Sequence, residues 1–301
     1  MIHTPVLQKE VLKYLDPKPN ENFIDCTIGD GGHGLVILEA IEPDGKLLGL
    51  DWGQENIHRL KFKIQNSKFK KRLILVNDNF ANLKEIVRRE KFGPVSGILL
   101  DLGMSSWHLE ESGKGFSFLR KEFLDMRYNP ENPQTAEKII NYWSKNDIEK
   151  ILTEYGEERF AKIIANEIIK TRKARPIKTT FELVEIIRKA VPHWYLRQKI
   201  HFATRTFQAL RIAVNDELNN LKKVLPQTID ILKPGGRLVI ISFHSLEDKI
   251  VKNFFSAFAK GYGGQERKLE ILTKKPVRPS TQEINYNPRS RSARLRVAIK
   301  I

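Results

Sequence analysis

Short apolar runs alternate with helical patterns over the first hundred residues, and this rhythm constrains the fold more than any other feature of the chain. The apolar runs cover residues 22–26, 47–51, 73–76 and 96–101, and helical stretches begin near His33, Gln54 and Ala81. Such alternation is typical of successive βαβ units, in which helices join parallel strands. We therefore predict that the first third of the chain forms half of a doubly wound α/β sheet.

The rhythm stops after Leu102, and a helical pattern replaces it. Between about residues 135 and 189 the apolar residues recur at helical spacing, without a convincing strand. Thr179 and Glu182 have the spacing of a capping box, which marks the start of one of these helices. We predict an all-helical domain over residues 111–203, inserted into the sheet domain.

The last hundred residues are expected to complete the sheet. A long amphipathic helix begins near Thr206, and one apolar face of it carries Phe207, Leu210, Val214, Leu218, Leu221 and Leu225. A turn at Lys233-Pro-Gly-Gly236 follows, and further strands are expected at residues 237–243, 269–272 and 293–301, which makes seven in all. The sheet domain then comprises residues 1–110 and 204–301, the second part ending in a basic tail.

The charge of the chain indicates a polyanionic partner. Its 52 Lys and Arg residues exceed its 36 Asp and Glu residues, so the formal net charge is +16. Like charges repel one another in a compact state, and nucleic acid is the leading partner that would offset this cost. A generally lysine-rich composition is the alternative, which the total charge alone leaves open.

Several classes of protein are excluded by what the sequence lacks. Cys26 is the single cysteine, so neither an intrachain disulfide nor a thiolate metal cluster can form. The seven histidines show no paired ligand spacing, and we predict no metal site. No apolar run is long enough for a membrane span or a signal peptide, which predicts a cytoplasmic protein without membrane attachment.

A glycine motif directly follows the first expected strand. Gly29-Asp-Gly-Gly-His-Gly34 fits G-x-G-x-x-G, and Asp51 lies about 20 residues further on, at the end of the second strand. The glycines allow a tight turn, and the acid can accept hydrogen bonds from ribose hydroxyls. The pattern alone fits both a nicotinamide dinucleotide and S-adenosylmethionine.

Charge separates these two ligands. A dinucleotide presents a pyrophosphate to the loop, which should then lack carboxylates, whereas Asp25 and Asp30 flank the loop here. S-adenosylmethionine carries a sulfonium and an ammonium, and acids at Asp25, Asp51 and Asp101 would attract them. Each acid by itself fits a helix cap or a solvated turn. Their joint position at the ends of three strands favours S-adenosylmethionine and a methyltransferase.

Longer strings, in order along the chain, resemble one family. They include Asp25-Cys-Thr-Ile-Gly-Asp-Gly-Gly-His33, Asp101-Leu-Gly-Met-Ser-Ser106, Leu124-Asp-Met-Arg127, Arg205-Thr-Phe-Gln-Ala-Leu-Arg211, Ile241-Ser-Phe-His-Ser-Leu-Glu-Asp248 and Asn287-Pro-Arg-Ser-Arg-Ser-Ala-Arg-Leu-Arg296. They are similar to the MraW family of bacterial 16S ribosomal RNA cytosine-N4 methyltransferases. The resemblance implies a Rossmann-like class I S-adenosylmethionine-dependent fold with an inserted helical domain for RNA recognition. It also implies methylation of a decoding-centre cytidine in the small ribosomal subunit, without a stable protein partner.

The resemblance assigns a cofactor site residue by residue. The implied contacts are Gly31, Gly32, His33, Asp51, Phe80, Asp101 and His108. Three positions depart from the family pattern: His108 replaces the usual Gln, Asp30 stands where Arg is common, and Trp52-Gly53 replaces a more polar pair. From the residues alone, Phe80 equally fits a loop aromatic that packs on the sheet, and His33 a residue at a helix start.

The fourth strand ends at Asp101, where the methyl group and its acceptor should meet. Enzymes that methylate exocyclic amines often have an Asn/Asp/Ser-Pro-Pro-Tyr/Phe motif there, and this chain lacks it. We expect Asp101, Ser105 and Ser106 to be the catalytic candidates, with Phe243 and His244 lining the same edge. The serine pair equally fits a helix N-cap.

Arginines concentrate near the end of the chain, and we expect them to hold RNA phosphates. The candidates are Arg278, Arg289, Arg291, Arg294 and Arg296. The alternative is that a final strand merely projects alternate arginines into solvent. Other functions stay open at this point: a nicotinamide-dependent oxidoreductase, a non-catalytic RNA-binding assembly factor and a DNA cytosine-N4 methyltransferase.

Overall fold

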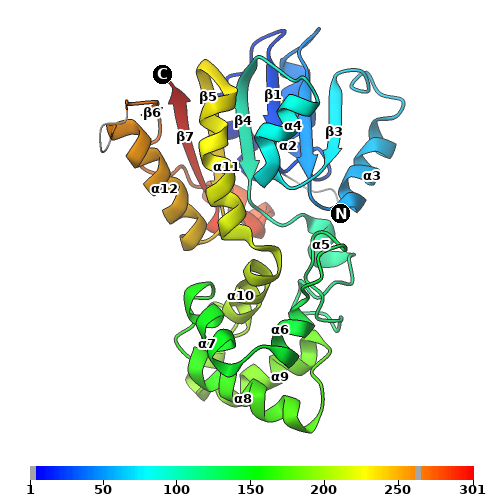
Figure 1. Cartoon of the computed structure of the whole chain (residues 1–301), viewed down its shortest axis with the longest axis vertical. Coiled ribbons are helices and arrows are strands. Elements are labelled where there is room, and N and C mark those ends of the chain that lie inside the picture. Colours follow the sequence, from blue (N-terminus) through cyan, green and yellow to red (C-terminus); the bar gives the residue numbers. More distant parts are fainter. Residues whose placement is uncertain (1–4, 262–265) are drawn as a thin grey trace. The chain divides into compact units, whose positions relative to one another are not determined.

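The computed structural model describes residues 5–261 and 266–301. The chain forms two compact units (Figure 1). Unit 1 runs to Gly103 and resumes at Leu218, and unit 2 comprises Met104–Glu217. No helix among the described residues is both long and apolar enough to cross a membrane.

Unit 1 is built on a seven-stranded sheet, as predicted. Its strands are β1 (Asn22–Asp25), β2 (Leu47–Asp51), β3 (Leu73–Asn77), β4 (Val95–Asp101), β5 (Leu232–Ser242), β6 (Leu269–Ile271) and β7 (Arg294–Lys300). They lie in the order β3-β2-β1-β4-β5-β7-β6. The first five strands are parallel, and β7 runs antiparallel to both β5 and β6. The predicted Rossmann-like α/β class is confirmed.

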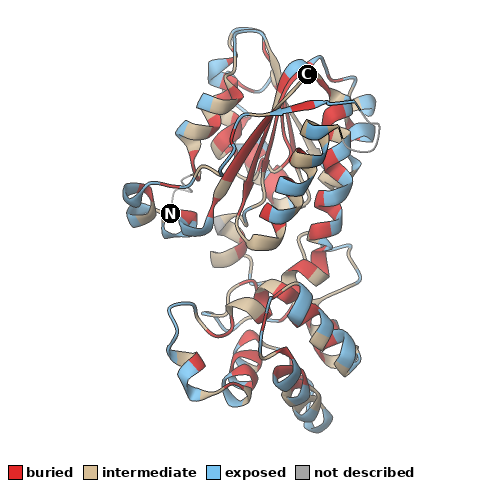
Figure 2. Cartoon of the chain, turned by 90° about the vertical axis from the view of Figure 1, so that its left-hand side faces the viewer, coloured by how far each residue is buried: buried red, intermediate tan, exposed pale blue. Residues whose placement is uncertain are grey.

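Apolar side chains project from both faces of this sheet, because successive side chains of a strand point to opposite sides. Phe23 and Leu99 belong to one buried cluster, and Ile24 and Leu100 belong to the other. The first cluster is covered by α1 (Gln8–Leu15), α2 (Gly32–Ala40) and α3 (Gln54–Ile64), and the second by α4 (Leu83–Arg89), α11 (Glu217–Ile231) and α12 (Ser245–Lys260). Figure 2 shows the buried strands between helices whose outer faces are exposed. Continuous apolar runs therefore became strands covered on both sides.

The expected turn at Lys233-Pro-Gly-Gly236 is instead part of β5. Val95 of β4 pairs with Leu232, and Gly97 already pairs with Arg237, so the intervening residues bulge out of the ladder. Gly235 supplies the left-handed backbone that this bulge needs, with φ of 76°.

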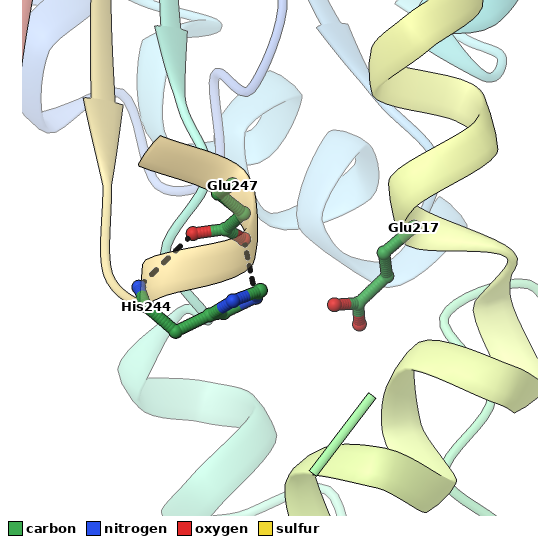
Figure 3. Close-up of side chains that lie close together, drawn as sticks. All are labelled: Glu217, His244 and Glu247. Atoms are coloured by element: carbon green, nitrogen blue, oxygen red, sulfur yellow. Dashed lines mark hydrogen bonds and ion pairs between the residues drawn. The ribbon is translucent and has the colours of Figure 1, made fainter. Parts of the chain in front are cut away.

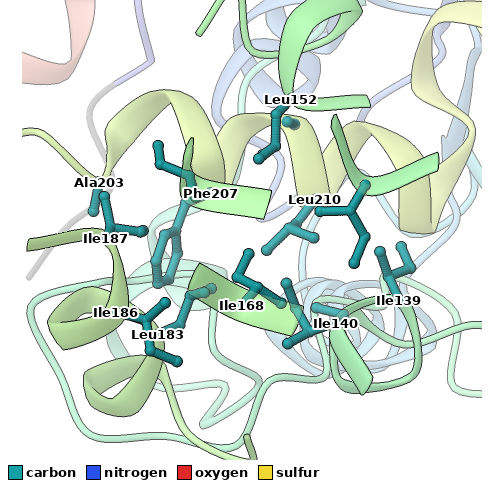
Figure 4. Packing of buried hydrophobic residues seen from close by; sticks show 14 of the residues in the cluster. Ile139, Ile140, Leu152, Ile168, Leu183, Ile186, Ile187, Ala203, Phe207 and Leu210 are labelled. Atoms are coloured by element: carbon teal, nitrogen blue, oxygen red, sulfur yellow. The ribbon is translucent and has the colours of Figure 1, made fainter. Parts of the chain in front are cut away.

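The regular secondary structure of unit 2 is helical over its described residues, apart from an isolated antiparallel bridge between Phe123 and Thr179. Its helices are α5 (Ser106–Glu110), α6 (Ala136–Tyr142), α7 (Lys145–Glu154), α8 (Ala161–Ala174), α9 (Thr180–Ala190) and α10 (Thr204–Asn215), with a 3-10 turn η2 (His193–Arg197). Ile140, Leu152, Ile168 and Phe207 are among the residues of its own core (Figure 4). α13 (Thr281–Tyr286) belongs to unit 1. The predicted capping box of Thr179 and Glu182 is confirmed at the start of α9.

The expectation of one long helix from near Thr206 to the Lys233 turn is wrong, because the helix is interrupted at Asp216. That residue has φ of 50°, a left-handed conformation that ends α10 before α11 begins. Phe207, Leu210 and Val214 pack in the core of unit 2. Leu221 and Leu225 pack in a core of unit 1. The division after residue 217, rather than after the expected residue 203, follows from this split of one apolar face between two cores.

Candidate active site

Three carboxylates lie at the carboxyl ends of neighbouring parallel strands in unit 1. Asp25 ends β1, Asp51 ends β2 and Asp101 ends β4. The chain order of the strands reverses between β1 and β4, and ligands of open α/β sheets bind at such a switch point. The sheet thus brings together acids that are far apart in the sequence.

The glycine loop turns from β1 into α2 at this edge. Gly31 precedes the helix with φ of 82°, a conformation that disfavours side chains. A Cβ on Gly32 would lie 2.5 Å from the ring of Pro5, and the Gln8 amide donates a hydrogen bond to the Gly32 carbonyl at 3.0 Å. The segment before α1 therefore packs directly on the loop, which gives both glycines a packing role. Their contact with a cofactor stays a prediction.

Asp51 organises the loops around it. Its Oδ1 accepts hydrogen bonds from the Gly53 amide at 2.8 Å and from Asn56 Nδ2 at 3.1 Å, and its Oδ2 accepts one from the Gly29 amide at 3.0 Å. Desolvation nevertheless raises the pKa of Asp51 to about 6, against the effect of these donors. The expected ribose contact would add to this set of hydrogen bonds.

Thr27 links Asp25 to the end of β4, and the sequence analysis missed this residue. The Asp101 amide donates to Thr27 Oγ1 at 2.7 Å, and the Thr27 amide donates to the Asp25 carboxylate at 3.0 Å. Burial raises the pKa of Asp25 to about 7, and the nearby Asp101 charge adds to this rise. The only signal in the sequence was a threonine two residues after the first acid, which is common in turns.

His33 is buried beside Asp101. Its Nε2 lies 3.5 Å from Asp101 Oδ2, yet neither ring nitrogen forms a hydrogen bond. Asp101 Oδ1 accepts a long hydrogen bond from the Gly103 amide, at 3.3 Å. Buried polar atoms are normally satisfied, so an imidazole that is 5% exposed and unsatisfied fits a site for a polar ligand.

The charge of this edge fits a cationic ligand. Within residues 5–261 and 266–301, no lysine or arginine forms an ion pair with Asp25, Asp51 or Asp101. Asp30, by contrast, is paired with Arg59. Two carboxyls with raised pKa values and no cationic partner would bind a sulfonium or an ammonium favourably and a pyrophosphate unfavourably. The residues present fit S-adenosylmethionine.

Phe80 begins a short 3-10 turn, η1 (Phe80–Asn82), after β3. The side chain of Asn79 caps this turn by accepting a hydrogen bond from the Ala81 amide at 2.9 Å. Phe80 is half-buried against the core that α4 covers. Packing on the sheet therefore accounts for this aromatic, and stacking on a cofactor stays a prediction.

The remaining predicted residues of the loop after β4 belong to unit 2. Ser105 is the N-cap of α5, and its hydroxyl lies 2.7 Å from Nδ1 of His108. The His108 ring is buried and packs edge-on against Trp107, Phe116 and Tyr128. Ser106 begins α5, and its side chain lies outside the described residues. Ser105 thus serves as the N-cap that we considered beside a catalytic role.

One of the five predicted RNA-binding arginines requires correction. Arg296 is 8% exposed, and its Nε and Nη2 donate to the two Asp248 oxygens at 2.6 and 3.1 Å. Arg294 shares that carboxylate at 3.1 Å. Both side chains lie on the face of β7 that α12 covers and reach the α12 acid, although Arg294 keeps partial exposure to solvent. Arg278, Arg289 and Arg291 are exposed.

The corner after β5 lies beside the end of β4. The side chain of Glu247 is buried; its Oε2 accepts hydrogen bonds from the Phe243 amide at 2.8 Å and the His244 amide at 3.3 Å. Its Oε1 lies 3.1 Å from His244 Nε2 (Figure 3). The sequence placed Phe243 and His244 at this edge, but only the fold identifies Glu247 as the group that holds them. A Cβ on Gly103 would lie 2.9 Å from the Phe243 ring.

Comparison with known proteins identifies the family of this chain. A model of the MraW methylase family matches residues 1–301. A protein of Heliobacterium mobile named ribosomal RNA small subunit methyltransferase H is 45% identical, and the alignment covers 99% of each chain. A protein of the same name from Halothermothrix orenii is 46% identical, over 99% of this chain and 98% of that one. A solved putative rRNA-methylase from Clostridium thermocellum aligns over 100% of both chains with 11% identity and a TM-score of 0.49. The chain therefore belongs to the MraW methylase family and is an S-adenosylmethionine-dependent methyltransferase.

Proposed function

We propose that this enzyme methylates the exocyclic N4 of a decoding-centre cytidine in the 16S RNA of the small ribosomal subunit. The names of its relatives support a ribosomal RNA substrate of the small subunit. The observation that carries the proposal is the group of strand-end acids that form no ion pair with a lysine or arginine of the described residues, beside the buried His33 imidazole, which forms no hydrogen bond with them. That edge is suited to a cationic methyl donor.

S-adenosylmethionine supplies an electrophilic methyl group on its sulfonium. The residues of unit 1 proposed to hold it are Gly31, Gly32, His33, Asp51, Phe80 and Asp101; His108 stays a prediction from the family resemblance alone. Asp25 and Thr27 stabilise this edge of the sheet. The Asp25 carboxylate accepts a hydrogen bond from the Thr27 amide, and Thr27 Oγ1 accepts one from the Asp101 amide. A preorganised acidic edge adds electrostatic attraction for the donor without reorganisation during the reaction.

Cytosine N4 is a poor nucleophile because its lone pair is delocalised into the ring. As N4 bonds to the methyl carbon, the carbon–sulfur bond breaks, positive charge builds on the amine, and a proton must leave. Asp101 is the proposed acceptor, since among the described residues its Oδ1 accepts only the long hydrogen bond from the Gly103 amide. His33 Nε2 lies 3.5 Å from the other oxygen of Asp101 without a hydrogen bond to it. Ser105 and Ser106 stay as weaker candidates, since Ser105 already caps a helix.

The basic charge supports a large RNA substrate, and it is unevenly distributed. Residues 218–301 contain 17 Lys and Arg but only 6 Asp and Glu. Arg278, Arg289 and Arg291 lie exposed in this segment and are proposed to contact phosphates, with Arg294 partly available. Unit 2 is proposed to contribute RNA recognition.

The test is methyl transfer from labelled S-adenosylmethionine to small ribosomal subunits that lack the modification. We expect the label in N4-methylcytidine at a single position, identified by digestion and mass spectrometry of the nucleosides. The variant Asp101→Asn lacks the proposed proton acceptor and should lose most of the incorporation of label. Label in another base or in large subunits would contradict the proposed target. Binding of NAD in place of S-adenosylmethionine would favour an oxidoreductase, and RNA binding without any transfer would favour an assembly factor.

A further inference from the structure

The aromatic ring of Phe243 reaches the loop that follows Asp101. A Cβ built on Gly103 would lie 2.9 Å from the Phe243 ring atoms Cε2 and Cζ, and 3.3 Å from Asp101 Oδ1. The ring and the candidate proton acceptor thus converge on one point at the carboxyl edge of β4 and β5. Gly103 is exposed, so this point lies at the surface of unit 1.

The backbone of Phe243 is held firmly at this point. Its amide donates to the buried Glu247 carboxylate at 2.8 Å, at the start of α12. Its side chain is half-buried and packs against the core that α1, α2 and α3 cover. A ring fixed in this way is preorganised to receive a flat ligand, because little side-chain freedom remains to be lost on binding.

The loop itself offers no aromatic residue. Asp101 is followed by Leu102, Gly103 and Met104, where enzymes acting on exocyclic amines often have an aromatic. A side chain at Gly103 would displace the Phe243 ring, so the glycine leaves room for a ring that comes from the neighbouring strand. The fold thereby places an aromatic beside Asp101 that the local sequence lacks.

We propose that Phe243 is the residue on which the target cytosine stacks while its N4 meets Asp101. This inference rests on the proposed function, because it assumes a base as the acceptor. Bases stack readily on aromatic side chains, and removal of such a ring weakens binding by about 5- to 150-fold per base. Phe243 then determines affinity for RNA and the orientation of the base, while S-adenosylmethionine binding is independent of it.

The experiment compares Phe243→Leu, Phe243→Tyr and Gly103→Ala in methyl transfer to small subunits. Phe243→Leu should raise KM for RNA about 10-fold or more, whereas Phe243→Tyr should retain near-normal KM because it keeps the ring. Gly103→Ala should raise KM as well, because its methyl group displaces the ring. Combined with Phe243→Leu it should add little, since both changes remove one interaction. Affinity for S-adenosylmethionine, measured by calorimetry, should stay within about twofold in Phe243→Leu and Phe243→Tyr.

Phe258→Leu is the matched control. Phe258 is also half-buried on unit 1, and it lies about 20 Å along α12 from the Phe243 corner. It should lose comparable packing but keep KM for RNA. Equal KM in wild type, Phe243→Leu and Phe258→Leu would overturn the stacking role, as would a loss in Phe243→Tyr as large as in Phe243→Leu. If wild type itself labels no cytidine N4, the proposed function fails instead.

Discussion

We expect Arg296 to stabilise the fold and not to bind RNA, and the variant Arg296→Met tests this expectation. The guanidinium is 8% exposed and donates two hydrogen bonds to Asp248. Although burial opposes it, pairing with Arg296 and Arg294 lowers the pKa of Asp248. Removing one partner of a buried ion pair costs about 3–5 kcal/mol, because the other charge stays buried. Arg294 remains beside Asp248, so we expect a loss near 3 kcal/mol.

Two assays separate the roles. A destabilisation of about 3 kcal/mol lowers the melting temperature of a unit of this size by about 6–12 °C, which calorimetry resolves. Arg296→Met should leave the salt dependence of RNA binding unchanged. The double variant Arg289→Met/Arg291→Met replaces two exposed arginines and should have the opposite effects. Its free energy of unfolding should stay within about 0.5 kcal/mol of wild type, and the slope of log K against log salt should fall by up to about two units.

Two results would contradict these expectations. If Arg296→Met melts within about 1 °C of wild type and loses about one unit of salt slope, its guanidinium contacts phosphate despite the pair with Asp248. If Arg289→Met with Arg291→Met leaves the slope unchanged, the exposed arginines do not contact RNA phosphates.

Further expectations concern the acids of the candidate site. Asp51→Ala should weaken S-adenosylmethionine binding by about 1.5–3 kcal/mol, because it removes a charged acceptor and frees the Gly29 amide; unchanged affinity in calorimetry would contradict this. Asp101→Asn should lower kcat about 10²-fold or more under saturating substrates, and near-normal turnover at saturation would limit Asp101 to binding. Burial raises the pKa of Asp25 to about 7 from 3.8, so its stabilising contribution is complete below about pH 4 and is lost as pH rises through about 7. Asp25→Asn should flatten that pH dependence in urea unfolding, and an unchanged profile would show that another group causes it.

The sequence by itself was sufficient for the sheet and for the acids at its edge. Strand ends at Asp25, Asp51 and Asp101 follow from apolar runs of strand length separated by helical patterns, which is local information. Parallel strands present their carboxyl ends at one edge, so the joint position of these acids follows from topology without knowledge of any contact. The glycine motif then indicated the kind of ligand through charge alone.

Sequence periodicity does not identify the partner of a side chain, and the tertiary structure decided those points. One apolar face from Phe207 to Leu225 looked continuous, and the left-handed residue Asp216 divides it between two cores. For Arg296 the sequence offered contact with phosphate or projection into solvent, yet α12 covers that face of β7 and supplies Asp248.

The same limit applies at the candidate site. Thr27 Oγ1 accepts a hydrogen bond from the Asp101 amide, 74 residues away in the sequence. The Phe243 ring fills the space beside Gly103, although the two residues are even further apart in the sequence. A local pattern shows that a residue is polar, apolar or small because those properties belong to the residue itself. Hydrogen bonds, burial of charge and close packing belong to pairs of residues, so they appear only when the folded chain brings both partners together.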